Sequence, residues 1–597
     1  MELKNSFKTL NYMRKILMSE TDHILPFPVR PQKPLFAGQK PVPLPRCSPK
    51  QAAVPSKALN EFLKALSSAS NGAPHTCIVA RDDHVICEAA WAPYSTGTWH
   101  VTHSLCKSFV GTAIGMLWDE GKIELDEKIC SIFPERCNLM TSRKARSLTV
   151  EHLLTMSSGS TFREAGAVVE SDWVRGFLES EFEFEPGTQM DYNSMNTYLL
   201  SAILRRKAGC SLMEYLRPRL FEPMGFGDVA WERCPNGIEK GGWGMYVFLE
   251  DAVKLGMLYL HKGVWKGQRL LSEAWVEQAT TTHLSRDTGE EYGFQIWTNS
   301  EKKRFLFNGM FGQYVIVCPD LDMVIGINAG AGNLFTRSAT LKAANQLLAQ
   351  VQSAAPDDPR AENELADTLA ALSYDGTVAR PAPSPASSLS RFFARLFRPA
   401  APEASSLPPE IQSLPLSVFH FSQNHASLLP LISSCMNDWY SEGVKKCRFS
   451  LKENELSLLW WESGQAYELP IGFDHARSCT LNFGGNVFQA AARGKAVLNE
   501  DDELVLKITI NYLELSSTRI LKVFFRPDQT IRLQMLETPS LRLVFQMLEK
   551  NVPASVKSKM DLFRDMEYLW YRIDKVCSPV LTGMAQPQSL YKERETT

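Results

Sequence analysis

The stretch SLCKSFVGTAIGMLWDEG, residues 104–121, is the part of the chain from which the fold can be inferred. Apolar residues recur in it at helical spacing: Leu105, Phe109, Ala113 and Met116. Gly121 is typical of a helix end, and the β-prone residues HVTH stand directly before Ser104. We therefore expect a buried helix that begins at Ser104 immediately after a strand.

Ser104 and Lys107 form an S-x-x-K tetrapeptide at the start of this helix. Residues three positions apart share a helix face, so the Lys107 amine can reach the Ser104 hydroxyl. A serine at a helix start also lies at the positive end of the helix dipole. The same tetrapeptide occurs at Ser300–Lys303 and Ser589–Lys592, both in hydrophilic segments. Taken alone, Ser104 could equally be a helix cap and Lys107 a surface lysine.

The surrounding sequence predicts an α+β fold. Residues 75–91 form an expected β-hairpin with a polar turn at 81–84. Helical patterns follow at residues 150–156, 196–206, 249–261 and 273–280, and β-prone runs follow at residues 313–318 and 323–327. Strands at both ends of the region with helices between them indicate an antiparallel sheet with segregated helices.

Four regions differ in composition along the 597 residues. We expect an extended Pro-rich N-terminal arm over residues 1–57, lying on the protein's own surface, and a catalytic α+β domain over residues 58–352. An Ala/Pro/Ser-rich linker follows over residues 353–415, with a short helix at 361–372. Alternating residues predict a C-terminal antiparallel β sandwich or barrel over residues 416–597. LSRFFARLFR, residues 389–398, fits a helix docked on a neighbouring domain better than a membrane-surface helix.

Charge and cysteine content exclude several classes of function. The net charge of -2 provides no overall attraction for nucleic acid, and no apolar run approaches the ~18 residues of a membrane span. The 13 cysteines are scattered without a C-x-x-C, which favours reduced thiols and a cytoplasmic protein. The 11 histidines form no recognisable metal motif, and no dinucleotide or phosphate loop is present, so we expect no metal and no cofactor.

Five stretches in the right order resemble the serine β-lactamase-like hydrolases, in particular the class C branch with its penicillin-binding carboxypeptidases, esterases and 6-aminohexanoate-dimer hydrolases. The first is residues 104–129. The others are VEHLLTMSSGS at 150–160, EPGTQMDYNSMNTYLLSAIL at 185–204, the segment from 241 to 275 that begins GGWG, and FNGMFGQYVIVCPDLDMVIGINAG at 307–330. The resemblance runs from Pro74 to Val351. It implies a β-lactamase/penicillin-binding-protein-like catalytic domain.

The resemblance also implies roles for individual residues. Ser104 corresponds to the acylated nucleophile, Lys107 to the group that helps take its proton, and Tyr192 to a tyrosine that shares the proton shuttle. Ser194 and Asn196 follow Tyr192 and are expected to orient Lys107 or the substrate. The second oxyanion donor is expected to be the N–H of Gln313, next to Gly312.

The chain departs from the family at the element that precedes Gln313. Met310 and Phe311 stand where relatives place a lysine or histidine that receives a substrate carboxylate. An apolar wall cannot compensate a buried carboxylate, so we expect a neutral ester or amide rather than a β-lactam. Ser194 stands where β-lactamases have Asn, as in the 6-aminohexanoate-dimer hydrolase and esterase branch. Cys106 is expected to pack as a small apolar residue away from the pocket.

Two functions from different classes stay open at this point. The first is a serine hydrolase that acts through an acyl-enzyme on a small-molecule or short-peptide substrate. The alternative is a catalytically idle relative that binds a peptide or a protein partner. A Ser104–His103 pair is disfavoured, because adjacent residues at a strand–helix junction point apart.

Overall fold

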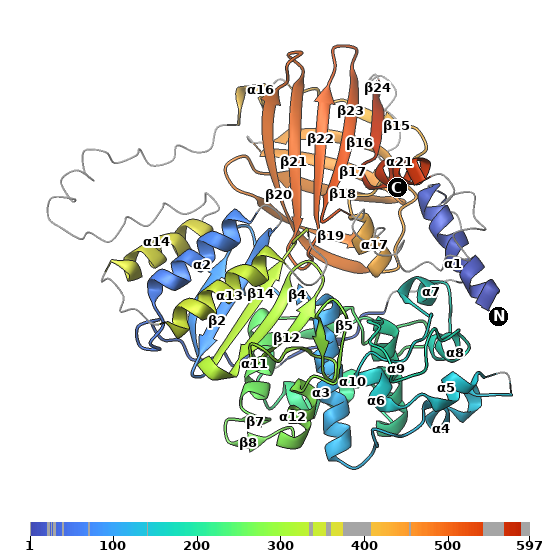
Figure 1. The fold of residues 1–597 in the computed structure, drawn as a ribbon. Coiled ribbons are helices and arrows are strands. Elements are labelled where there is room, and N and C mark those ends of the chain that lie inside the picture. The colour runs from blue at the N-terminus through green and yellow to red at the C-terminus, as the bar shows by residue number, and fades with distance from the viewer. Residues whose placement is uncertain are drawn as a thin grey trace. The chain divides into compact units, whose positions relative to one another are not determined.

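The structure is a computed structural model in which the chain divides into two compact units (Figure 1). The first unit comprises Met1–Met13, Leu25–Ala90 and Tyr94–Leu365, and the second comprises Arg14–Ile24, Trp91–Pro93 and Ala366–Thr597. The structure describes residues 2–18, 20, 24, 25, 27, 32–38, 41–69, 72–139, 141–332, 338–353, 360–373, 407–412, 414–452, 455–540 and 566–586.

An eight-stranded antiparallel sheet forms the centre of the first unit, in the order β3-β2-β14-β13-β12-β11-β10-β9. The N-terminal hairpin pairs directly with the last strand of the unit, because β2 lies beside β14. The strands are β2 (Pro74–Arg81), β3 (His84–Ala90), β9 (Leu284–Ser285), β10 (Glu291–Tyr292), β11 (Trp297–Asn299), β12 (Arg304–Gly309), β13 (Gln313–Cys318) and β14 (Met323–Ala329). The expected sheet from both ends of the region is confirmed.

Helix α11 (Leu249–Leu260) packs on β2, β13 and β14. Its Gly256 permits this approach, since a Cβ there would lie 2.8 Å from Val315 and 2.9 Å from Val324. Helices α2 (Ser56–Ser68) and α13 (Ala339–Gln352) pack against each other. Apolar side chains that are fully buried on β13 and β14 make the sheet the core of the unit.

A helical region lies between the hairpin and the later strands. Its central helix α3 (Cys106–Asp119) contacts α9 (Ser194–Ala208), and α6 (Val150–Leu154) also packs on α9. The shorter helices are α4 (Ile129–Ile132), α5 (Arg143–Ser147), α7 (Glu164–Val168), α8 (Trp173–Leu178), α10 (Leu212–Leu216) and α12 (Glu273–Thr280). The predicted helices at residues 104–121, 150–156, 196–206, 249–261 and 273–280 are thus confirmed within a few residues.

A second, four-stranded sheet has the order β1-β5-β6-β4, and its strand β4 directly precedes the segment that contains Ser104. Its strands are β1 (Leu35–Phe36), β5 (Val229–Trp231), β6 (Met245–Val247) and β4 (His100–Val101). A separate two-stranded ribbon joins β7 (Val264–Trp265) to β8 (Gln268–Arg269). Because β1 pairs with β5, this part of the Pro-rich arm lies on the unit's own surface.

The second unit contains a nearly closed ten-stranded antiparallel barrel, which confirms the barrel form of the prediction. Its order is β18-β17-β16-β15-β24-β23-β22-β21-β20-β19, with a bridge between Gly472 and Arg493 near the seam. The strands are β15 (Val418–Phe421), β16 (Val444–Lys452), β17 (Glu455–Glu462), β18 (Gln465–Ile471), β19 (Arg477–Phe483), β20 (Asn486–Leu498), β21 (Leu504–Tyr512), β22 (Thr518–Phe525), β23 (Thr530–Thr538) and β24 (Val580–Gln586).

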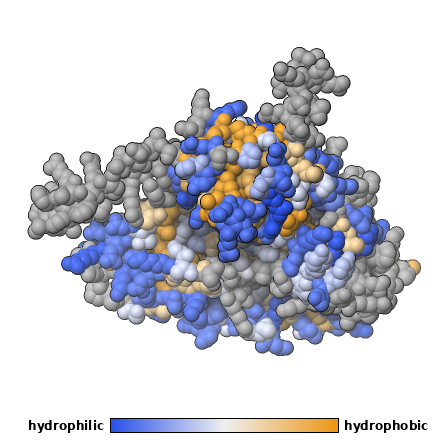
Figure 2. Space-filling view, turned by 90° about the horizontal axis from the view of Figure 1, so that it is seen from above, coloured by the Kyte–Doolittle hydropathy of each residue, from blue (hydrophilic) through white to orange (hydrophobic). Residues whose placement is uncertain are grey.

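Alternation along the strands sets the interior of the barrel. Leu506, Ile508 and Ile510 are fully buried, whereas the intervening Lys507 is exposed. The helices of this unit are α16 (Pro409–Gln412), α17 (Leu431–Met436) and α21 (Met566–Cys577), and α14 (Ala361–Ser373) begins in the first unit and ends in the second. Figure 2 shows a patch of apolar side chains with hydrophilic residues around it.

Three expectations need correction or fall outside the description. Residues 2–17 form the helix α1 (Glu2–Leu17) rather than part of an extended arm. Cys130 and Cys137 form a disulfide, so not every cysteine is a reduced thiol; seven residues of separation let a short loop close without any recognisable cysteine motif. The helix expected within the linker is present as α14, but residues 389–398 lie outside the described residues.

Within the part of the chain that the structure describes, no helix combines the length and the apolar character needed to cross a membrane.

Candidate active site

Ser104 lies in a 3₁₀ turn, His103–Leu105, that runs directly into α3. Strand β4 ends at Val101, two residues before the start of this turn, so the backbone changes from strand to helix around the serine. Ser104 is 7% exposed and Lys107 is 1% exposed. The Lys107 amine donates hydrogen bonds to the Ser104 hydroxyl (2.9 Å), the Ser194 hydroxyl (3.0 Å) and the Gly242 carbonyl (2.6 Å).

All three acceptors of Lys107 are neutral, and no ion pair joins this amine to a carboxylate among the described residues. Burial therefore lowers the pKa of Lys107 to about 8, against smaller opposing effects of Cys106 and Glu164. With that pKa, roughly a quarter of the molecules carry a neutral Lys107 at pH 7.5. A neutral amine beside a hydroxyl is a base that can accept its proton.

Tyr192 lies two residues before α9 and borders the same group of side chains. Its ring stacks on Trp297 at 5.2 Å between centroids and meets Tyr292 edge-on at 6.0 Å, and the Lys107 amine lies 5.1 Å from its centroid. Burial raises the pKa of the Tyr192 phenol, while a hydrogen bond with Ser104 acts in the opposite direction. The phenol is thus held in its protonated form next to the Ser104 hydroxyl.

Of the two polar residues expected after Tyr192, only Ser194 reaches Lys107. Asn196 is fully buried one position beyond Met195, and its side-chain oxygen accepts a hydrogen bond from the Ser158 hydroxyl at 2.6 Å. Asn193, which the sequence did not single out, caps α9 by accepting from the Met195 N–H at 2.9 Å. The cap fixes the first turn of α9, from which Ser194 projects to Lys107.

Sequence reasoning missed the Gly242 carbonyl as a partner of Lys107. Gly242 packs directly on Ser194, because a Cβ at this position would lie 2.7 Å from the Ser194 carbonyl oxygen. Glycine therefore lets the 241–244 loop approach α9 closely enough for its carbonyl to accept from Lys107. The sequence GGWG at residues 241–244 indicated a close backbone approach, but it could not show that the Gly242 carbonyl accepts a hydrogen bond from Lys107.

The turn at residues 310–312 joins β12 to β13 and lies against the Ser104 turn. Gly309 allows this contact, since a Cβ there would lie 2.2 Å from the Thr102 carbonyl oxygen and 3.2 Å from the Leu105 nitrogen. Phe311 and Gly312 both have positive φ angles, 62° and 91°. The buried Phe311 ring meets His103 edge-on at 5.4 Å, while Met310 is half-buried.

The Gln313 side chain supports this turn from within. Its amide donates to the carbonyls of Met310 (3.2 Å), Phe311 (3.2 Å) and Ala329 (2.7 Å), and its oxygen accepts from the Ala329 N–H at 3.3 Å. Gln313 is fully buried. The first residue of β13 is therefore held rigidly beside the Ser104 turn.

His103 precedes Ser104, and Cys106 lies between Ser104 and Lys107 in the S-x-x-K tetrapeptide. Burial, followed by the charges of His100 and Lys107, lowers the pKa of His103 to about 3, so this imidazole is neutral. The Cys106 thiol is fully buried and donates to the Gly241 carbonyl at 3.0 Å, on the side of the glycine loop. The described residues contain no group of three or more His, Cys, Asp or Glu that could hold a metal ion.

Residues 75–353 match the family model described as Beta-lactamase. This segment belongs to the serine β-lactamase-like hydrolases. The family and fold class expected from the sequence are thereby confirmed, and the segment is a hydrolase domain.

Curated relatives agree with this membership. A 6-aminohexanoate-dimer hydrolase of Paenarthrobacter ureafaciens is 24% identical over 314 residues, which cover 47% of this chain and 79% of the relative. A β-lactamase of Escherichia coli (strain K12) is 26% identical over 155 residues, or 26% of this chain and 40% of the relative. Among solved structures, a putative 6-aminohexanoate-dimer hydrolase from Bacillus anthracis is 17% identical with a TM-score of 0.44, covering 54% of this chain and 90% of that one.

Proposed function

We propose that the first unit is an acyl-enzyme serine hydrolase in which Ser104 is the nucleophile, Lys107 its base and Tyr192 the proton donor to the leaving group. One observation carries this assignment. The Lys107 amine lies 2.9 Å from the Ser104 hydroxyl in a buried setting that lowers its pKa to about 8. A surface lysine beside a helix cap would be exposed and fully charged, so the simple capping interpretation does not fit.

In the acylation step, the Ser104 oxygen bonds to the substrate carbonyl carbon as its proton passes to neutral Lys107. The bond to the alcohol or amine leaving group then breaks, and the leaving group takes a proton through Tyr192, which Lys107 reprotonates. Water next attacks the acyl ester, so the carboxylic acid leaves and Ser104 regains its proton. The N–H groups of Ser104 and Gln313 are proposed to hold the oxyanion.

A neutral ester or amide is the proposed substrate. Met310 and Phe311 line the turn where relatives place a cation, and both are apolar. Arg304, a nearby cation that could replace it, donates instead to the Asn345 side chain at 2.7 Å. An anionic substrate would therefore lose hydration without gaining a partner at this turn. The curated hydrolase of an aminohexanoate dimer is consistent with an amide.

A fluorophosphonate probe separates this proposal from the catalytically idle alternative. The probe should label the wild-type protein covalently, and mass spectrometry should locate the label on Ser104. Ser104→Ala should not label. Ser300→Ala is the matched control, because Ser300 opens the exposed S-x-x-K at 300–303, and it should label like wild type. A wild-type protein that does not react, or label on another serine, would contradict the assignment.

A cytoplasmic location is part of the proposal. Cys130 and Cys137 form the only disulfide among the described residues, although the chain has 13 cysteines. Many of the others are buried in the cores, as expected for thiols that pack as small apolar groups.

A further inference from the structure

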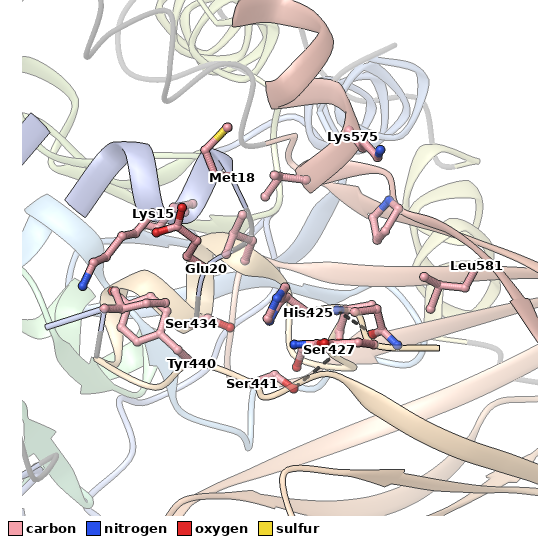
Figure 3. A pocket seen from close by; sticks show the side chains of 18 of the residues that line it. Lys15, Met18, Glu20, His425, Ser427, Ser434, Tyr440, Ser441, Lys575 and Leu581 are labelled. Carbon is pink, nitrogen blue, oxygen red and sulfur yellow. Dashed lines mark hydrogen bonds between the residues drawn. The ribbon is translucent and has the colours of Figure 1, made fainter. Parts of the chain in front are cut away.

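Buried ion pairs occur in both units, in different surroundings. In the second unit, Arg519 pairs with Glu537 at 3.3 Å in the wall of a cavity of about 710 Å³. Figure 3 shows this cavity with Ser427 in its lining, and the Ser427 hydroxyl donates to Glu462 at 2.8 Å. These polar side chains have partners within the protein and stabilise the cavity wall. A buried pair of the first unit lies instead beside the candidate active site.

That pair joins Glu232, which follows β5, to Lys240. The Lys240 amine lies 2.9 Å from a carboxylate oxygen of Glu232, and the two residues are 3% and 6% exposed. Removing one partner of such a pair leaves an uncompensated buried charge, which is strongly unfavourable. The attraction therefore holds the two chain segments together in the folded protein.

Glu232 contacts both ends of the 241–244 loop. Its backbone N–H donates to the Gly244 carbonyl at 2.9 Å, and its carbonyl accepts from the N–H of Lys240, the residue directly before the loop, at 2.8 Å. The preceding residue supports the same loop, since the Trp231 indole donates to the Trp243 carbonyl at 3.0 Å. The ion pair thus closes a loop whose two ends are attached to one residue.

The other side of the loop contacts α3 and α9. The Gly241 carbonyl accepts from the Cys106 thiol at 3.0 Å, and the Gly242 carbonyl accepts from the Lys107 amine at 2.6 Å. A Cβ at Gly241 would lie 2.9 Å from the Thr197 carbonyl oxygen of α9. The position of the loop therefore sets the position of the Gly242 carbonyl.

This carbonyl decides where a neutral Lys107 amine directs its lone pair. A neutral amine has two N–H groups and one lone pair, and Lys107 has three neighbouring acceptors. When Ser194 and the Gly242 carbonyl accept the two N–H groups, the lone pair is left to face the Ser104 hydroxyl. Without the Gly242 carbonyl, an N–H group can face Ser104 instead, and the amine is then oriented wrongly for a base.

We propose that the Glu232–Lys240 ion pair is a positioning device for Lys107: it holds the 241–244 loop so that the Gly242 carbonyl directs the lone pair of the amine at Ser104. The proposal rests on the proposed function of Ser104 and Lys107. Glu232 and Lys240 act through the loop and not on the substrate, so they are positioning residues.

The rate at which a fluorophosphonate labels Ser104 between pH 6 and 9 tests the proposal, because labelling depends on the base. Glu232→Gln/Lys240→Met removes the pair without leaving a lone buried charge. Labelling at the upper plateau should slow about tenfold or more, because the lone pair is no longer directed at Ser104.

The midpoint of the labelling profile should also move. The protonated amine has three N–H groups and loses a partner when the Gly242 carbonyl withdraws, whereas the neutral amine needs only two acceptors. The pKa of Lys107, about 8 in the wild type, should therefore fall by about 0.5 unit or more. Glu232→Gln alone is a milder second variant, and its midpoint should move in the same direction by a smaller amount.

Asp251→Asn/Lys254→Met is the matched control. It removes another buried pair, of 2.6 Å, on α11, whose other hydrogen bonds go to Gly225 and Gly227 rather than to the loop. Its Tm should fall, while its labelling rate and midpoint should stay at the wild-type values.

The outcomes separate this proposal from the proposed function. A lowered Tm with an unchanged plateau and midpoint in both Glu232 variants would show a purely structural pair and overturn the positioning role alone. Equal shifts of the midpoint in the control would do the same. A wild-type protein that is not labelled on Ser104 would overturn the proposed function, and the positioning role with it.

Discussion

The proposed chemistry depends, at the residue scale, on one buried amine. Lys107 contacts Ser104, Ser194 and the Gly242 carbonyl, and none of these partners carries a charge. A fraction of the amines is therefore neutral at physiological pH, which is the condition for a base. Tyr192 retains its proton because burial raises its pKa. In the proposed mechanism, Lys107 is thus a base that can be unprotonated and Tyr192 is an acid that keeps its proton.

Loss of either partner should disable the same step. We expect Lys107→Ala and Tyr192→Phe each to lower kcat by about 10²-fold or more. The kcat of the double variant should be scarcely lower than that of the less active single variant. Residues that act as a unit show non-additive losses of this kind. Steady-state kinetics on a neutral p-nitrophenyl ester provides the measurement. Losses that multiply would show that the two residues act independently.

The pH dependence follows from the sign of the Lys107 shift. Burial lowers its pKa to about 8, and only the neutral amine can accept the Ser104 proton. Activity should therefore rise with pH and level off above about pH 8. If the pKa of the lysine were not shifted, activity would continue to rise beyond about pH 10. The measurement is kcat/KM on a neutral ester between pH 6 and 9.5. A rise in kcat/KM with its midpoint near about pH 6.5 would indicate a histidine base instead.

At the scale of elements, close backbone approaches bring the site together. Gly309 brings the β12–β13 turn onto the Ser104 turn, and Gly242 brings the 241–244 loop onto α9. At each of these two positions, a residue with a Cβ would push the two backbones apart. The geometry of the candidate site therefore depends on glycines that have no side chain to take part in the proposed reaction.

Gly242→Ala should separate the loop from α9. The added Cβ would meet the Ser194 backbone at 2.7 Å, so the Gly242 carbonyl must shift away from Lys107. We expect kcat to fall by about tenfold or more, with the Tm lowered by a few degrees. Gly97→Ala is the control, because its Cβ would meet only the Ser95 hydroxyl, at 3.4 Å. Unchanged kinetics in Gly242→Ala would show that this carbonyl does not position the amine.

Met310→Lys tests the β12–β13 turn as the element that selects substrate charge. The added cation stabilises a bound carboxylate and leaves Ser104 untouched, so KM for an anionic substrate should fall about three- to tenfold. Activity on a neutral ester should not improve. The comparison uses nitrocefin and a neutral p-nitrophenyl ester with wild-type and variant protein. A wild-type protein that hydrolyses both equally well would refute the assigned selectivity.

At the scale of the whole molecule, each unit has its own core and its own buried charges. The barrel buries Glu462 completely, with hydrogen bonds from Trp460 (2.7 Å), Leu428 (2.9 Å) and Ser427 (2.8 Å). Burial raises the pKa of Glu462 to about 7 in spite of these donors. The stability of the second unit should therefore depend on pH in a range where most carboxylates have no effect.

The sign of that dependence is defined by the raised pKa. The folded barrel binds the Glu462 proton more tightly than the unfolded chain, so its stability should fall as pH rises from about 4.5 to about 7. The effect should amount to about 3 kcal/mol at most. Calorimetry at pH 5 and 8 should show that Glu462→Gln raises the stability of one transition at pH 8 and changes it less at pH 5. A shift of equal size at both pH values would contradict the assignment.

Local patterns in the chain were sufficient to predict the α3 helix, the hairpin at residues 75–91 and the alternating strands of the barrel. These elements depend on apolar periodicity and turn residues, which are properties of neighbours in sequence. The ordered motifs also predicted the family and placed Ser104, Lys107 and Tyr192 in one candidate site. They could not show that Asn196 binds Ser158, nor that Lys107 reaches Gly242.

Those contacts were decided by the tertiary structure, because they join segments 38 and 135 residues apart in the chain. The helical start of the expected arm and the Cys130–Cys137 disulfide were likewise visible only in the structure. The lowered pKa of Lys107 has the same origin. Its cause is burial among neutral partners, and burial is a property of the packed molecule that no local pattern contains.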